Sequence, residues 1–156
     1  MKKFLKGFVY AWNGLRFVIK QRNFRFHLCA VVFVTAFALG FYEFSRGEWA
    51  VLLLTMGLVP AMEALNTAME QLCDKVTSKQ DELIRRCKDC AAAAVLISAI
   101  AAVAVGIALF GDGERLMTAW VYLWSNPLRP LSLVIALGCA VAFVLLPEYL
   151  EKKSRP

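Results

Sequence analysis

The sequence has few of the residues from which disulfide-bonded domains and zinc sites are built. It contains one histidine, His27, and five cysteines, an odd number that does not suggest a disulfide framework. Cys87 and Cys90 have the CxxC spacing. A zinc site would need about two further ligands, and His27 lies on another segment. We interpret this pair as reduced thiols near the start of a helix.

Two further features are missing. There is no Walker-type glycine-rich loop, so any nucleotide site in this chain must be built without one. No cleavable signal peptide is evident, because Lys2, Lys3 and Lys6 are followed by a broken amphipathic pattern and not by an uninterrupted apolar run. We therefore treat the N-terminal segment as part of the fold.

The apolar residues that are present indicate a membrane protein. Hydrophobic residues make up 60% of the 156 residues, and the mean hydropathy is +0.58. A soluble domain has about 45–50% apolar residues, and here the excess lies in blocks too long for a small soluble core. The net charge is +6. Because the basic residues flank the apolar blocks, they fit the cytoplasmic face of a membrane protein and not a nucleic-acid partner. The composition predicts an all-α, polytopic membrane helix bundle.

The apolar blocks predict the helices. Residues 2–20 mix basic and aromatic side chains at near-helical spacing, which predicts an amphipathic helix in the membrane interface. Membrane-spanning helices are then expected over about 27–44, 49–62, 91–110 and 131–146. The second should continue as a polar-faced helix to Val76, with a kink at Pro60.

Polar segments separate these helices. Residues 43–48 make a short turn, and residues 77–79 break the helical pattern. Ser78 and Asp81 have capping-box-like spacing before a helix that is charged over residues 81–89.

The C-terminal part contains a second turn, an aromatic segment and a tail. Residues 111–114 form the turn, and residues 115–129 are too polar to span a membrane. Interfacial docking suits the aromatic rings of this segment, which are Trp120, Tyr122 and Trp124. The fourth span should end at Pro147, before the charged tail.

The basic residues also predict the orientation. Most lysines and arginines lie in the N-terminal segment, the loop over 75–88 and the tail, whereas the turns near 46 and 115 hold one each. The positive-inside rule therefore places both termini and the 75–88 loop in the cytoplasm. Four spans fit this arrangement.

One face of the second span carries polar residues. Glu63, Asn66, Glu70 and Asp74 are three, four and four positions apart and share one helix face. Ionisable residues in a membrane helix are costly and mark functional sites. Trp49 lies fourteen residues before Glu63, a rise of about 21 Å in a hydrocarbon core of about 30 Å. Glu63 is therefore expected in the cytoplasmic part of the bilayer, and Glu70 near the water boundary.

This difference in depth predicts different roles. A hydroxyl that attacks a phosphoryl group needs a base, and partial burial makes Glu63 the better base. Nucleotide phosphates need a divalent cation, usually held by one or two carboxylates. Glu70 is then the better metal ligand, and Asn66 can orient an oxygen. Four charged residues lie where phosphates and ribose could be held: Asp74, Lys79, Lys88 and Asp89.

Two other interpretations of the acidic face remain. The acids could form a structural polar seam, paired with lysines or arginines of neighbouring helices. They could also belong to a proton or ion path. Such a path predicts acids on several spans, and the first, third and fourth spans have almost none.

Three motifs are specific. Residues 63–70 read Glu-Ala-Leu-Asn-Thr-Ala-Met-Glu and are followed by Asp74 and then by Lys88-Asp89. Residues 10–16 read Tyr-Ala-Trp-Asn-Gly-Leu-Arg, and residues 23–27 read Asn-Phe-Arg-Phe-His. Together they resemble the prokaryotic diacylglycerol kinase and undecaprenol kinase family. The resemblance covers about residues 3–110, so we divide the chain into a kinase-like membrane domain over 1–110 and an interfacial segment with an additional span over 111–156.

The resemblance implies an ATP-dependent lipid kinase with Mg²⁺ as cofactor. It implies a homotrimer in the bacterial cytoplasmic membrane, with three spans, an interfacial N-terminal helix and active sites between subunits. Glu63 would be the catalytic base and Glu70 a metal ligand. The nucleotide site would contain Tyr10, Asp74, Lys79, Gln80, Asp81, Lys88 and Asp89. The lipid side would contain Trp12, Arg16, Asn23, Phe24, Arg25, His27 and Asn66.

The chain departs from the family pattern at Gln21. The family usually has a glutamate three residues before the Phe24 position, as a second metal ligand. Glutamine offers a carbonyl oxygen without the charge, so metal affinity should fall. The motif over 23–27 is similar to the undecaprenol kinase branch, and Ala92 replaces a small hydroxyl residue of some diacylglycerol kinases. Both favour undecaprenol as the lipid. The alternative is a weakly active or non-catalytic membrane scaffold of the same fold.

Overall fold

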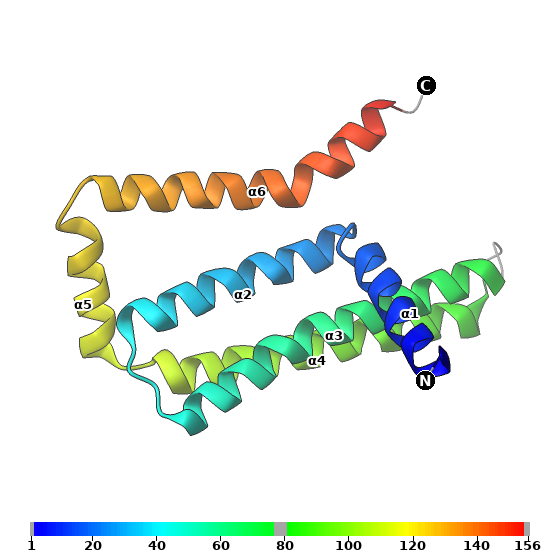
Figure 1. The fold of residues 1–156 in the computed structure, drawn as a ribbon, viewed down its shortest axis with the longest axis horizontal. Coiled ribbons are helices and arrows are strands. Elements are labelled where there is room, and N and C mark those ends of the chain that lie inside the picture. The colour runs from blue at the N-terminus through cyan, green and yellow to red at the C-terminus, as the bar shows by residue number, and fades with distance from the viewer. Residues whose placement is uncertain (1, 77–80, 155–156) are drawn as a thin grey trace.

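A computed structural model describes residues 2–76 and 81–154 (Figure 1). The described residues form helices and connecting turns, with no strand among them. The helices are α1 (Lys2–Val18), α2 (Arg22–Phe41), α3 (Arg46–Val76), α4 (Glu82–Phe110), α5 (Gly113–Trp124) and α6 (Leu128–Ser154). The predicted all-α fold is confirmed.

Four of these helices are long and apolar enough to cross a membrane. They are α2, α3, α4 and the part of α6 over Leu128–Pro147. In α4 only 6% of the most apolar window is buried, and in α6 none is. Their apolar side chains therefore face outward, as expected for surfaces that contact lipid or other membrane helices. The predicted four-span bundle is confirmed.

The first span begins earlier than its hydropathy predicts. We expected it over 27–44, but α2 starts at Arg22 because Gln21 has extended backbone angles (φ −74°, ψ 136°) and serves as its N-cap. The helix ends at Phe41, where Tyr42 becomes extended and its N–H still donates to the Ala38 carbonyl. Asn23 and Arg25 therefore lie in helical positions at the start of the span, and not in a preceding loop.

The next helix begins with a capping box that the sequence analysis missed. The Ser45 hydroxyl accepts from the Glu48 N–H at 3.3 Å, and the Glu48 carboxylate accepts from the Ser45 N–H at 2.7 Å. These bonds explain why α3 begins at Arg46, three residues before the expected Trp49.

Both internal prolines are accommodated within helices. α3 runs through Pro60, and α6 runs through Pro147 to Ser154. The apolar part of α6 that is long enough to span a membrane covers Leu128–Pro147, and the helix itself continues to Ser154. Figure 1 shows the axis of α6 changing direction in its orange-red part. A proline inside a helix removes one hydrogen bond and crowds the preceding turn, so a bend without termination is a normal result.

The packing of the helices brings the elements that surround the candidate site together at one end of the molecule. α3 and α4 pack along their length as an antiparallel pair, and α2 packs against α3 and α6. Figure 1 shows α1, the end of α3, the start of α4 and the C-terminal end of α6 at the same end of the molecule. These are the segments that the positive-inside rule assigns to one side of the membrane.

Aromatic residues hold the opposite end together. The Tyr42 hydroxyl donates to the Phe110 carbonyl at 2.9 Å, and the rings of Phe37 and Phe44 lie 5.7 and 5.3 Å from that of Phe110. Burial, with Asp112 nearby, raises the pKa of Tyr42. Tyr42 therefore remains a neutral hydroxyl that can donate.

Tyr42→Phe should lower the free energy of unfolding by about 1 kcal/mol, because it leaves the Phe110 carbonyl without its donor. Denaturant titration in detergent micelles measures this change. Tyr122→Phe is the matched control, because the Tyr122 side chain is exposed and its ring stacking survives the change. Equal effects of the two substitutions would contradict a role for the Tyr42 hydrogen bond.

Candidate active site

The acidic face of α3 runs from buried to exposed positions. Glu63, Asn66 and Thr67 are 4%, 6% and 6% exposed, whereas Glu70 is exposed. The spacing of three and four residues places them on one side of the helix. The Asn66 amide donates to a Glu70 carboxylate oxygen at 3.0 Å. One glutamate is therefore secluded, and the other is oriented by an amide and open to solvent.

These residues border a pocket of about 620 Å³, here called the site pocket. It lies where the start of α2 and the residues just before it meet α3 and the C-terminal part of α6. Its lining consists of Lys20, Gln21, Arg22, Asn23, Arg25, Glu63, Thr67, Glu70 and Pro147. The structure thus brings five of the predicted site residues to one cavity: Gln21, Asn23, Arg25, Glu63 and Glu70.

Buried polar atoms in this region lack partners. Arg25 is 5% exposed, and its Nη2 donates to the Val144 carbonyl at 2.9 Å, yet its Nε has no hydrogen-bond acceptor. The Asn66 Oδ1 is also buried without a donor. In the part of the chain that the structure describes, neither Glu63 nor Glu70 forms an ion pair. This arrangement does not fit a structural seam of paired charges.

The donor groups of the site pocket suit a magnesium ion. Glu70 supplies a carboxylate and Gln21 a side-chain carbonyl. Mg²⁺ keeps several waters and is usually held by one or two carboxylates together with substrate phosphates. Among the described residues no group of three or more His, Cys, Asp or Glu side chains could hold a metal by itself. A magnesium ion here would therefore depend on phosphate oxygens for part of its coordination.

An apolar pocket adjoins the site pocket. It has a volume of about 470 Å³ and lies between α1 and α3, where Gly14, Leu15 and Phe24 face Ala64 and Thr67. Thr67 borders both pockets. A long apolar molecule could occupy this second pocket while its polar end reaches Glu63.

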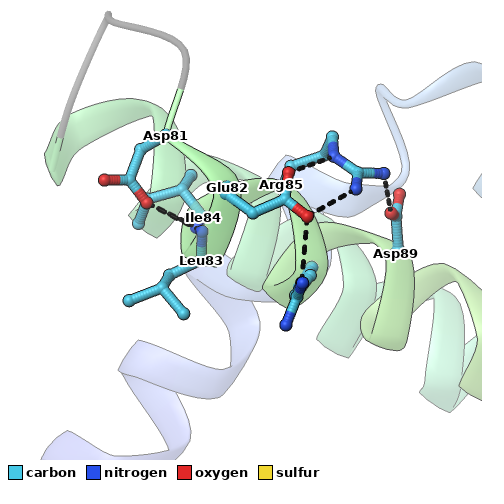
Figure 2. Close-up of polar contacts among 7 residues, drawn as sticks. Asp81, Glu82, Leu83, Ile84, Arg85 and Asp89 are labelled. Carbon is cyan, nitrogen blue, oxygen red and sulfur yellow. Dashed lines mark hydrogen bonds and ion pairs between the residues drawn. The ribbon is translucent and has the colours of Figure 1, made fainter.

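The charged residues at the end of α3 and the start of α4 form a separate cluster. Lys88 forms an ion pair with Asp74, which joins α4 to α3. Glu82 accepts hydrogen bonds from Arg85 and Arg86, and Arg85 also donates to Asp89 at 3.1 Å. Figure 2 shows Arg85 between Glu82 and Asp89. The cluster borders solvent, so its pairs can exchange for contacts with a soluble ligand at little cost.

The N-terminal cap of α4 is Asp81. Its carboxylate accepts from the N–H groups of Leu83 and Ile84 at 2.8 and 3.1 Å (Figure 2). The capping-box partner predicted from spacing, Ser78, lies outside the described residues, as do the predicted nucleotide residues Lys79 and Gln80. The role of Asp81 as a cap leaves its other carboxylate oxygen available.

Several predicted site residues lie away from the site pocket. On α1, Tyr10 is 69% exposed, and the Arg16 guanidinium stacks on the Trp12 ring at 5.3 Å. Phe24 lines the apolar pocket. His27 borders a third pocket, of about 400 Å³, with Thr55 and Met56. The sequence motif groups His27 with Asn23 and Arg25, but His27 lies one turn beyond Asn23 along α2 and therefore reaches a different pocket.

Four lining residues were not predicted. Thr67 is four positions from Glu63, so helical spacing alone could have included it. Lys20 and Arg22 flank the predicted Gln21, and proximity in sequence was their only signal. Pro147 is more than eighty residues from Glu63, and nothing in the sequence connects the two.

Comparisons with known proteins identify the family of this chain. Residues 9–110 match the family model for prokaryotic diacylglycerol kinase. The undecaprenol kinase of Bacillus subtilis is 34% identical over 113 residues, which is 70% of this chain and 89% of that protein. The diacylglycerol kinase of Synechocystis is 47% identical over 105 residues, 65% of this chain and 59% of that protein.

A third relative is similar over a comparable part of the chain. The diacylglycerol kinase of Escherichia coli is 34% identical over 102 residues, which is 65% of this chain and 83% of that protein. No solved structure matches. Since the family model covers most of the chain, including the whole acidic face of α3, the chain belongs to the prokaryotic diacylglycerol kinase family.

Proposed function

We propose that the chain is an integral membrane lipid kinase that transfers the γ-phosphoryl group of ATP to the hydroxyl of a membrane lipid. The observation that carries this proposal is the pairing of a buried glutamate, Glu63, with an exposed one, Glu70, in a polar pocket beside an apolar pocket. The names of the relatives support the same class of reaction.

The proposed reaction transfers a proton to Glu63 and a phosphoryl group to the lipid. The lipid hydroxyl gives its proton to the Glu63 carboxylate while its oxygen forms a bond to the γ-phosphorus. The bond between that phosphorus and the β,γ-bridging oxygen breaks, and ADP leaves. Glu63 is buried where a lipid hydroxyl would arrive from the apolar pocket, which keeps water from competing for the phosphoryl group.

Glu70 and Gln21 would hold the magnesium ion that neutralises phosphate charge when it is bound. The Asn66 amide fixes the Glu70 carboxylate by one oxygen, which leaves the other oxygen free to face the metal. A fixed ligand loses less entropy on binding, so Asn66 contributes to metal affinity without touching the metal.

The nucleotide is placed at the solvent-exposed end of α3 and α4. Asp74, Lys88 and Asp89 lie there in exchangeable ion pairs, and Lys88 can turn from Asp74 to a phosphate oxygen. We place Tyr10, Lys79, Gln80 and Asp81 on this side of the site as well, and Trp12, Arg16 and His27 on the lipid side. This assignment needs both termini and the 75–88 loop to be cytoplasmic, in a bacterial plasma membrane. We also propose the homotrimer that the family resemblance implies.

Undecaprenol is the favoured lipid and diacylglycerol the second candidate. The purified full-length protein should phosphorylate one of them with MgATP, measured as labelled lipid phosphate. A panel of both lipids over a range of magnesium and manganese concentrations decides between them. Absence of lipid phosphate throughout that panel would refute the kinase and favour the second candidate function, a non-catalytic membrane scaffold. Gln21 in place of a glutamate motivates that second candidate.

A further inference from the structure

The C-terminal helix α6 reaches the site pocket from outside the family region. The family match ends at residue 110, whereas α6 begins at Leu128. Pro147 nevertheless lines the site pocket together with Glu63 and Glu70. One turn before Pro147, the Val144 carbonyl accepts a hydrogen bond from Arg25. This chain therefore adds a wall to the site that the matched region lacks.

Pro147 disturbs the turn of α6 that meets Arg25. Proline has no N–H, so the Phe143 carbonyl loses its usual donor four residues later, and the proline ring opens that turn. In the opened turn the next carbonyl, that of Val144, accepts from the Arg25 guanidinium at 2.9 Å, and the guanidinium lies 6.0 Å from the Phe143 ring. Arg25 is thus fixed from α6 and not from its own helix.

Arg25 keeps unused donor capacity. A guanidinium has five N–H donors and stays charged. The Arg25 side chain is only 5% exposed, and its Nε has no hydrogen-bond acceptor. An unpaired buried charged donor is strongly unfavourable. Arg25 lines the site pocket, and among the described residues it forms no ion pair with Glu63 or Glu70. An anion in the site pocket would offset its charge and give the guanidinium a further acceptor.

We propose that Arg25 binds a phosphoryl oxygen of the group being transferred, and that α6 is a positioning element that holds Arg25 for this task. The proposal rests on the proposed kinase function. A guanidinium matches phosphate geometry and stabilises the charge on the phosphoryl oxygens as the bond to ADP breaks. Val144 and Phe143 fix the guanidinium from one side, and the phosphoryl group completes its bonds from the other.

The experiment uses the full-length protein with Arg25→Lys, Arg25→Gln, Pro147→Ala and the double variant Arg25→Gln/Pro147→Ala. Leu145→Ala is the control, because Leu145 lies on the face of α6 opposite Phe143 and Pro147 and is 49% exposed. Turnover, the KM values for ATP and lipid, and the melting temperature are measured for each. Binding of inorganic pyrophosphate by calorimetry gives a readout independent of catalysis.

Arg25→Lys should lower kcat by about 100-fold, because lysine keeps the charge but lacks the planar fork that holds the Val144 carbonyl and a phosphoryl oxygen in fixed geometry. Pro147→Ala should lower kcat by about 3- to 10-fold in the wild-type background and have no further effect on Arg25→Gln, since α6 acts through Arg25. Leu145→Ala should match the wild type, and Arg25→Gln should weaken pyrophosphate binding at least about 10-fold.

The possible outcomes distinguish positioning by α6, the phosphoryl contact of Arg25 and the proposed kinase function. Equal effects of Pro147→Ala in both backgrounds, or none in either, would refute positioning by α6. Wild-type kcat in Arg25→Lys with unchanged pyrophosphate binding in Arg25→Gln would refute the phosphoryl contact. If the wild type phosphorylates no lipid while Arg25→Gln loses pyrophosphate binding, the kinase function fails and the anion site stands.

Discussion

Glu63→Gln should reduce lipid phosphorylation by about 10²–10⁴-fold, the range for loss of a general base. An amide has nearly the same shape as the carboxylate but cannot take the proton of the lipid hydroxyl. Since Glu63 is 4% exposed and forms no ion pair among the described residues, its replacement leaves no charged partner stranded. The KM values for ATP and lipid should therefore change far less than kcat.

The control for this prediction is Glu114→Gln, an exposed glutamate at the opposite end of the molecule on α5. It removes the same charge from the protein without approaching the site. Melting temperatures in detergent show whether either variant has lost its fold. A folded Glu63→Gln protein with wild-type turnover would remove Glu63 from the role of base, and the source of proton transfer would have to be sought elsewhere in the site pocket.

The features that could be predicted from sequence are those set by local periodicity. Four apolar blocks gave the four spans, and intervals of three and four residues placed Glu63 and Glu70 on one face of α3. The rise per residue also predicted that they differ in depth along a helix that crosses a membrane. The burial of Glu63 among other side chains is a separate result of the packing around α3. The roles assigned to them stay predictions.

The features that could not be predicted depend on contacts between distant segments. Hydropathy placed the start of the first span after Arg25, because an arginine reads as a polar flank. In the structure Arg25 is buried within α2, and its side chain donates a hydrogen bond to the Val144 carbonyl, 119 residues away. Tyr10 is 69% exposed on α1 and lines none of the pockets described above, so its place on the nucleotide side stays a prediction from its motif. Periodicity carries no information about which helix covers another.

Gln21→Glu should lower the magnesium concentration for half-maximal activity by about tenfold, because ligand charge is a main determinant of affinity for hard divalent cations. Gln21 is the N-cap of α2 and lines the same pocket as Glu70. A carboxylate at this position also interacts favourably with the N-terminus of that helix. The added negative charge therefore interacts favourably with both the magnesium ion and the N-terminus of α2, so the fold should tolerate the substitution. Kinase activity titrated with magnesium, and separately with manganese, measures the change.

The matched control is Gln71→Glu, which makes the same chemical change at an exposed position of α3, one residue past Glu70 and outside the site pocket. A general increase in negative charge near the nucleotide would act similarly in both variants, whereas a new metal ligand acts only at position 21. Equal magnesium titrations for Gln21→Glu and the wild type would mean that Glu70 and the nucleotide phosphates suffice to hold the ion. A gain confined to Gln21→Glu would mean that the natural enzyme works with one carboxylate fewer than its site can accommodate, and that its activity follows the magnesium supply more steeply as a result.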